Sequence, residues 1–216
     1  MSNPSNPAEN EVPIDGSRDI GLSDEELVAR AQQGDRAAFA ELMLRYQDRI
    51  YNSVYRMCRD AEDASDMTQT TFLRALQALP RFESRASVYT WLFRIAMNLT
   101  ISLLRSRKRV VLSLQHPDQN GQERDLPDGR ETSSADELDR AALMRKVEAA
   151  LEQVDADFRA AVVLRDIEGL DYATIGSILE LPVGTVKSRI HRGRLLIREI
   201  VTRETHARDA AKFQSG

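Results

Sequence analysis

The stretch Asp171-Tyr-Ala-Thr-Ile-Gly-Ser-Ile-Leu-Glu-Leu-Pro-Val-Gly-Thr-Val-Lys-Ser-Arg-Ile-His-Arg-Gly-Arg194 decides how the C-terminal part of the chain folds. Two helical patterns meet in it at a short break, Glu180-Leu181-Pro182. Asp171 is a good N-cap for the first helix. Pro182 suits the first turn of the second helix, where its missing N–H leaves no hydrogen bond unmade. Two helices joined by so short a break predict a helix-turn-helix.

The second helix of this pair is amphipathic. At about 100° per residue, its apolar face should pack on the rest of the domain and consists of Val186, Ile190, Gly193, Ile197 and Ile200. Its opposite face is polar and carries Thr185, Lys187, Ser188, His191 and Arg192. Between Pro182 and Arg203 six Lys or Arg stand against one Glu, a local charge of +5 in a chain of net charge −4. Such a helix favours nucleic-acid binding, with its N-terminal residues at base edges in the major groove. A solvated basic face on an ordinary helical hairpin is the alternative.

Composition places the chain among all-α proteins that act by binding. The 216 residues are 42% apolar, enough for real cores, and no strand-like alternation stands out. No apolar run reaches the roughly 18 residues of a membrane span, and residues 1–19 lack the features of a secretion signal. The single Cys58 fits a reducing cytoplasm, and the three histidines lack metal-ligand spacing. We expect no catalytic residue, no metal and no cofactor, because no nucleophile–base pair or Gly-rich phosphate loop is present.

The N-terminal half reads as a series of capped helices. Ser23 and Glu26 form a capping box, which opens a helix that should end near Gly34. A longer amphipathic helix follows, and Asp60 then caps a helix that should run to about Leu79. This last helix carries Asp63, Asp66 and Gln69 on a polar face and Phe72 on its apolar line.

The next predicted helix, over residues 88–109, combines aromatic side chains with a basic end. From Arg85 to Arg109 there are six Lys or Arg and no acidic residue. Rings on which bases stack, followed by cations that hold phosphates, are typical of single-strand binding. Trp91 and Phe93 would serve equally well as core residues.

An acidic segment separates the two helical regions. Residues 113–139 hold eight Asp or Glu and two Lys or Arg, together with several Pro and Gly. This composition predicts a flexible linker. We therefore expect a disordered lead over 1–21, a first helical domain over 22–112, a linker over 113–135, a helix-turn-helix domain over 136–203 and a short polar tail over 204–216.

Three motifs in this order resemble the extracytoplasmic-function (ECF) sigma factors of bacterial RNA polymerase. The block from Asp60 to Leu76 is similar to the polymerase-binding helix of that family. The block from Tyr89 to Asn98, Tyr-Thr-Trp-Leu-Phe-Arg-Ile-Ala-Met-Asn, is similar to its −10 promoter reader. The block from Leu181 to Arg194 is similar to its −35 reader. His191 departs from the residues often found there, so the resemblance carries no base preference.

The resemblance implies partners and roles for individual residues. Core RNA polymerase would be contacted, through its largest subunits, by Asp63, Asp66, Gln69 and Phe72. The −10 element would be contacted by Arg94, Asn98, Arg105, Arg107, Lys108 and Arg109, with Asn98 and the loop 83–87 near a flipped base. The −35 element would be contacted by Arg165, Thr185, Lys187, Ser188, His191, Arg192 and Arg194, of which Arg165 and Arg194 would touch phosphates. An anti-sigma factor is a further implied partner.

Two other classes of protein share parts of this pattern. A helix-turn-helix regulator with a sensor domain would bind duplex DNA without polymerase, usually as a dimer. It leaves the aromatic block and the face of Asp66 and Gln69 unexplained. An enzyme with a helix-turn-helix tail, such as a recombinase, would need catalytic groups that the sequence does not present.

Overall fold

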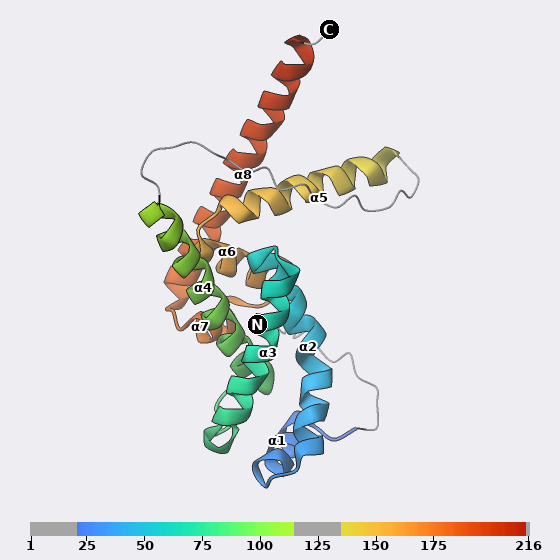
Figure 1. The fold of residues 1–216 in the computed structure, drawn as a ribbon, viewed down its shortest axis with the longest axis vertical. Coiled ribbons are helices and arrows are strands. Elements are labelled where there is room, and N and C mark those ends of the chain that lie inside the picture. The colour runs from blue at the N-terminus through green and yellow to red at the C-terminus, as the bar shows by residue number, and fades with distance from the viewer. Residues whose placement is uncertain (1–20, 115–134, 215–216) are drawn as a thin grey trace, which may run out of the picture.

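The computed structural model describes residues 21–114 and 135–214, and this part of the chain folds into helices without a strand (Figure 1). The N-terminal domain contains α1 (Asp24–Gln32), α2 (Arg36–Cys58), α3 (Ala61–Ala78), the short 3-10 helix η1 (Leu79–Arg81) and α4 (Val88–Leu114). The C-terminal domain contains α5 (Ala135–Gln153), α6 (Ala156–Val162), the π-helical turn η2 (Val163–Ile167), α7 (Tyr172–Leu179) and α8 (Val183–Gln214). The fold is all-α with two helical domains, as the sequence predicts.

Side-chain caps fix where the first three helices begin. The backbone N–H of Ser23 donates to Glu26 at 2.8 Å and the Glu26 N–H donates to Ser23 Oγ at 3.2 Å, so the capping box is confirmed. The Asp35 carboxylate accepts from two backbone N–H groups at the start of α2. Asp60 accepts from the Asp63 N–H at 3.0 Å at the start of α3. These bonds satisfy N–H groups that have no partner within their helices.

The core of the N-terminal domain lies between α2, α3 and α4, which run side by side in Figure 1. Ile50, Met57 and Phe93 are fully buried there. Trp91 is 6% exposed and stacks on Phe82 with ring centroids 4.4 Å apart. The rings of Trp91 and Phe93 therefore belong to the core, and the expectation that they stack on bases is not met in this structure.

The helix-turn-helix is present at the expected place. Asp171 caps α7, and the predicted inner face of α8 is buried at Val186 and Ile190. Between the helices Glu180 adopts a left-handed conformation, with φ of 56°. The turn is so tight that a Cβ on Gly176 would lie 2.8 Å from the backbone oxygen of Leu181. Glycine is thus required at position 176.

Some helix bounds differ from the expected ones. Helix α4 continues to Leu114, inside the predicted linker, and α8 continues to Gln214, so the segment after Arg203 is largely helical. The helix capped by Asp155 ends in the π-helical turn η2, which the helical period alone does not reveal. The remaining predicted lead (1–20) and linker (115–134) lie outside the described residues.

The two domains are in contact. Helix α4 packs against α6 and α7, and α2 packs against α5, α6 and η2 (Figure 1). Buried side chains of both domains form one contiguous apolar cluster. The face of α4 that points away from its own domain is therefore partly covered by the other domain.

We expect Gly176→Ala to lower the free energy of unfolding by about 1–3 kcal/mol, the usual cost of forcing extra atoms into a packed site. Urea denaturation measures this. Gly184→Ala is the matched control, since nothing lies within 4 Å of a Cβ at Gly184, and alanine favours a helix by up to about 1 kcal/mol. Equal stability of the two variants would contradict the tight turn.

Candidate nucleic-acid interface

The basic residues of α4 divide into two groups by their direction. At about 100° per residue, one side of the helix holds all but one of the predicted contacts, namely Arg94, Asn98, Arg105, Lys108 and Arg109. Asn98, Arg105, Lys108 and Arg109 are exposed, and Arg94 is half-buried. Arg107 points to the other side. The structure thus brings five of the six predicted −10 residues onto one face.

Arg107 is committed to an ion pair within its own domain. Its Nη2 donates to Asp63 Oδ1 at 2.6 Å, and its Nη1 pairs with the other carboxylate oxygen. This carboxylate raises the pKa of Arg107 further above its ordinary value. The pair ties the C-terminal half of α4 to the first turn of α3. It joins a residue predicted to bind DNA to one predicted to bind polymerase.

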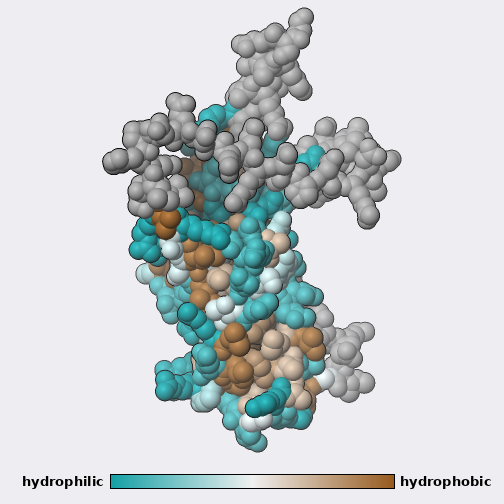
Figure 2. Space-filling model, in the orientation of Figure 1, coloured by the Kyte–Doolittle hydropathy of each residue, from teal (hydrophilic) through white to brown (hydrophobic). Residues whose placement is uncertain are grey.

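The outer face of α3 is polar at one end and apolar at the other. Asp66 and Gln69 are exposed, and Leu73 and Leu76 continue the same face with 61% and 48% exposure. Figure 2 shows hydrophobic surface over the lower part of the molecule, where the ends of α1, α2 and α3 lie in Figure 1. Phe72 is only 3% exposed and packs in the core, so its ring is not on this surface.

The first turns of α8 present the predicted major-groove residues. Lys187, Ser188, His191 and Arg192 are exposed, and Thr185 is half-buried. The Ser188 hydroxyl donates to the backbone oxygen of Thr185 at 2.9 Å. These side chains lie opposite the buried Val186 and Ile190, as the helical period predicts.

Tyr172, at the start of α7, organises cations beside this helix. The guanidinium of Arg165 lies 4.7 Å from the centre of its ring, and the Lys187 ammonium lies 5.4 Å from it. Arg165 also donates to the backbone oxygen of Leu170 at 2.7 Å. Both cations are close enough to the ring for cation–π attraction.

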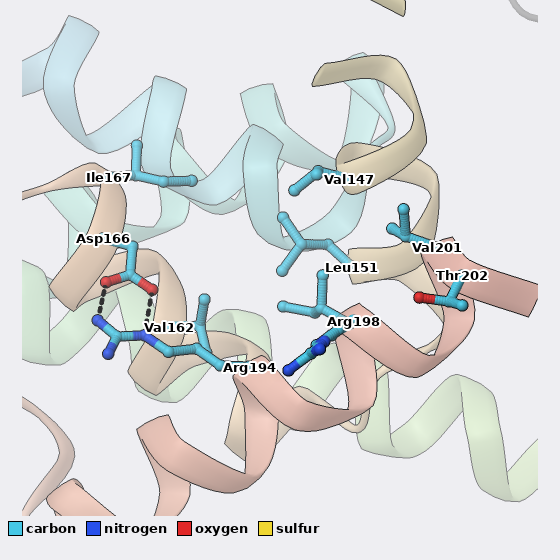
Figure 3. A pocket seen from close by; sticks show the side chains of 10 residues that line it. Val147, Leu151, Val162, Asp166, Ile167, Arg194, Arg198, Val201 and Thr202 are labelled. Atoms are coloured by element: carbon cyan, nitrogen blue, oxygen red, sulfur yellow. Dashed lines mark hydrogen bonds and ion pairs between the residues drawn. The ribbon is translucent and has the colours of Figure 1, made fainter. Parts of the chain in front are cut away.

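Arg194 lies at the rim of an apolar groove in the C-terminal domain. The guanidinium donates from Nε to Asp166 at 2.9 Å, and this bond raises the pKa of Arg194. The groove, of about 310 Å³, lies between α5, α6 with η2, and α8 (Figure 3). Its walls are mainly the aliphatic side chains of Val147, Leu151, Val162, Ile167, Ile197 and Val201. Arg194 therefore lies between this groove and the first turns of α8.

Some residues gain their importance from tertiary contacts that the sequence pattern does not reveal. Tyr172 belongs to the quoted stretch, but nothing in the sequence shows that its ring lies beside Arg165 and Lys187. Arg189 lies in the basic helix but pairs with Asp157 at 2.8 Å, a residue 32 positions away. Leu73 and Leu76 follow Asp66 and Gln69 at steps of three and four residues, so the sequence alone could have placed all four on one face of the helix.

Two general features bear on chemistry. Within the described residues, no cluster of three or more His, Cys, Asp or Glu side chains could hold a metal ion. Among those same residues, no helix has the length and apolar character needed to cross a bilayer. The arrangement instead offers two basic surfaces, one on each domain.

Comparisons with known proteins agree with this geometry. The Sigma-70 region 2 family matches residues 42–110, and the Sigma-70 region 4 family matches residues 144–197. The chain is 36% identical over 178 residues to the RNA polymerase sigma-H factor of Pseudomonas aeruginosa, covering 79% of this chain and 90% of that protein. It is 34% identical over 180 residues to the ECF RNA polymerase sigma-E factor of Salmonella typhimurium, covering 80% and 91%.

A solved structure shares the fold. It is the complex of the sigma factor RpoE with the anti-sigma factor NepR from Bartonella quintana. The similarity has a TM-score of 0.58 at 23% identity and covers 76% of this chain and 96% of that chain.

We expect Asp171→Ala to destabilise the protein by about 1 kcal/mol, the usual value of an N-cap. The Asp171 carboxylate accepts from the Thr174 N–H, the Thr174 hydroxyl and the Ala173 N–H, each at 2.8 Å. These bonds, those of Thr174 first, lower the pKa of Asp171 in the folded state.

This stabilisation depends on pH. A lowered folded-state pKa means that the contribution is complete above the unfolded value of about 3.9 and is lost as pH falls from there through the folded pKa. Urea titrations at neutral pH and below pH 4 test both statements. Asp171→Asn, which keeps a capping oxygen, is the control and should cost less. A loss for Asp171→Ala that does not shrink in acid would refute the role of the charge.

Proposed function

Because this chain belongs to the extracytoplasmic-function sigma factors of RNA polymerase, we propose that it binds core polymerase and directs initiation at promoters with two elements. The −35 element is read as duplex by α8, and the −10 element is read as melted strand by α4. The observation that carries the proposal is the presence of two separate basic surfaces, on domains matching regions 2 and 4 of the Sigma-70 family. A plain helix-turn-helix regulator needs only one of them.

In the duplex, Lys187, Ser188 and His191 face base edges and Arg192 lies beside them. Support comes from their exposure on one side of α8, opposite its buried face. Thr185 is half-buried and orients Ser188 by accepting its hydrogen bond. Arg165 and Arg194 hold phosphates, which cations at fixed positions contact without reading sequence.

In the melted region, Asn98 contacts an unstacked base of the non-template strand near the loop 83–87. The cations Arg94, Arg105, Lys108 and Arg109 on the same face of α4 hold the backbone. Binding only the single strand favours the open state, because a ligand shifts an equilibrium by its differential affinity. Arg107 reaches DNA only if its pair with Asp63 opens.

Polymerase docks on the outer face of α3. Asp66 and Gln69 supply the polar contacts, and the exposed Leu73 and Leu76 supply apolar area beside them. Phe72 supports this face from beneath, since its ring is buried. Asp63 contributes through its pair with Arg107 at the edge of the same helix.

We assign no reaction and no cofactor to the protein, and we place its action in the cytoplasm, where polymerase works. An anti-sigma factor is the expected regulator. The structurally similar RpoE of Bartonella quintana was solved with an anti-sigma factor bound, and here the partner would cover the DNA-binding and polymerase-binding faces.

Run-off transcription tests the function. Core polymerase and a pool of genomic promoter fragments from the source organism are incubated with and without the protein. The expected result is a set of new transcripts whose start sites share two spaced upstream elements. Binding to duplex DNA alone, with no new start sites, would instead identify a regulator.

We expect Asn98→Ala to reduce promoter opening more than it reduces binding of duplex −35 DNA, because Asn98 belongs to the single-strand surface. Permanganate footprinting measures opening, and fluorescence anisotropy measures duplex binding. Ser188→Ala is the matched control, since it removes a polar group from the duplex surface and should weaken −35 binding first. Equal losses of opening and duplex binding for Asn98→Ala would overturn the assignment.

A further inference from the structure

The loop 83–87, which we place near the flipped base of the melted strand, is short and ends on a helix cap. The Ser87 hydroxyl accepts from the Thr90 N–H at 3.1 Å and so caps α4. The residues at the start of the loop are exposed, and Ser84 among them has a left-handed backbone with φ of 54°. This conformation is uncommon for a residue other than glycine, and it persists only where the surroundings hold it. The shape of the loop therefore depends on how its two ends are anchored.

Gln32, the last residue of α1, anchors the other end of this loop. Its side-chain Nε2 donates to the backbone oxygen of Leu79 at 2.9 Å and to that of Phe82 at 2.8 Å. These two partners lie 47 and 50 positions further along the chain. A carbonyl oxygen only accepts, so both contacts use the NH2 group of the amide and occupy both of its hydrogens. Gln32 therefore binds η1 and the residue before the loop at once.

Phe82 is held by three different contacts at the point where the loop begins. Its ring stacks on Trp91 of α4 with centroids 4.4 Å apart. Its N–H donates to the Leu79 oxygen at 3.0 Å, and its own backbone oxygen accepts from Gln32. The ring contact fixes the side chain but not the peptide that follows it. The hydrogen bond from Gln32 fixes that peptide, and with it the direction in which the chain enters the loop.

Helix α1 gives Gln32 a fixed position from which to act. Leu27 and Val28 are 2% and 3% exposed and pack in the core of the N-terminal domain. At the start of the helix, the Asp24 carboxylate accepts from Arg45 of α2 at 2.7 Å. Helix α1 is thus tied to α2 along its length, and the Gln32 amide is carried on a rigid support.

We propose that Gln32 is a positioning residue for reading the −10 element: it holds the loop 83–87 in the orientation in which the loop meets the unstacked base. The inference rests on the proposed function, because it adds a residue of α1 to the surface that we assign to the melted strand. Gln32 acts through the backbone at Phe82. A site that distinguishes bases needs its contacting groups held to within about 0.5 Å, which requires such support from behind.

Two substitutions remove the donors of Gln32 and leave the length of its side chain nearly unchanged. Gln32→Met has no polar hydrogen, and Gln32→Glu places a carboxylate against the two carbonyl oxygens. Gln33→Met and Gln33→Glu are the matched controls, because Gln33 is exposed and follows directly at the same end of α1. Gln32 is exposed as well, so none of the four substitutions opens a cavity in the core.

Each full-length variant is combined with core polymerase on a promoter that run-off transcription has identified. Permanganate footprinting measures the opening of this promoter and of fragments in which single bases of the −10 element are replaced. The ratio of opening on the native fragment to opening on each replaced fragment gives the base discrimination, position by position. Urea denaturation measures the free energy of unfolding of each variant, and fluorescence anisotropy measures binding of duplex −35 DNA.

We expect both Gln32 variants to lose discrimination at one position of the −10 element by about fivefold or more, the lower end of what one mismatched base costs at a specific site. Discrimination at the other −10 positions and binding of duplex −35 DNA should match those of the unaltered protein. Both Gln33 variants should discriminate as the unaltered protein does. A role in stability alone would instead reduce opening by one common factor on every fragment.

Other results overturn the inference. If the Gln32 variants keep the same ratio at every position, the amide does not position the loop. If opening falls equally on all fragments, or if the Gln33 variants lose the same discrimination, the effect comes from stability or charge. The unaltered protein separates this failure from that of the proposed function, because a protein that is not a sigma factor opens no promoter with core polymerase before any substitution is made.

Discussion

The outward face of α4 packs against α6 and α7 of the C-terminal domain, and this contact decides how the two halves of the molecule lie relative to each other. The opposite face of the helix is fixed in the core, where Ala96 and Thr100 are fully buried, so α4 cannot rotate to expose its cations elsewhere. Arg105 therefore faces the C-terminal domain, where it pairs with Asp157. The C-terminal domain thereby covers part of the surface that we assign to the melted strand.

The interface between the domains combines specificity with modest stability. Buried ion pairs roughly balance their desolvation cost, so Glu168 with Arg49 defines one relative placement without making it very stable. The exposed pair of Arg105 and Asp157 adds little on its own and weakens with salt. When the domains separate, water solvates these charges, and this solvation offsets much of the interaction energy of the ion pairs that is lost. Such an interface suits a sigma factor, whose domains must spread over two promoter elements.

Local signals in the sequence predicted local structure well. The caps Asp60 and Asp171, the apolar face of α8 and the break before Pro182 all follow from short-range rules and are confirmed. The choice between core and surface for Trp91 could not be made, because an aromatic at helical spacing fits both. Pairs between domains were out of reach for another reason: Arg105 and Asp157 are 52 positions apart, and no spacing rule connects them. The helical period shows that Arg107 points away from the other cations of α4, but it does not show that Asp63 is its partner.

The close approach of α8 to α6 has a consequence for how this sequence can evolve. A Cβ on Gly193 would lie 2.6 Å from Val162 Cγ2 and 3.2 Å from the backbone oxygen of Phe158. Only the first of these contacts can be relieved by a smaller side chain, because the second involves the backbone. A larger residue at position 193 therefore requires a smaller side chain at position 162. It also shifts α8 relative to the backbone of α6 at Phe158. Sequence changes in α8 are thus tolerated more readily on its exposed side than at Gly193.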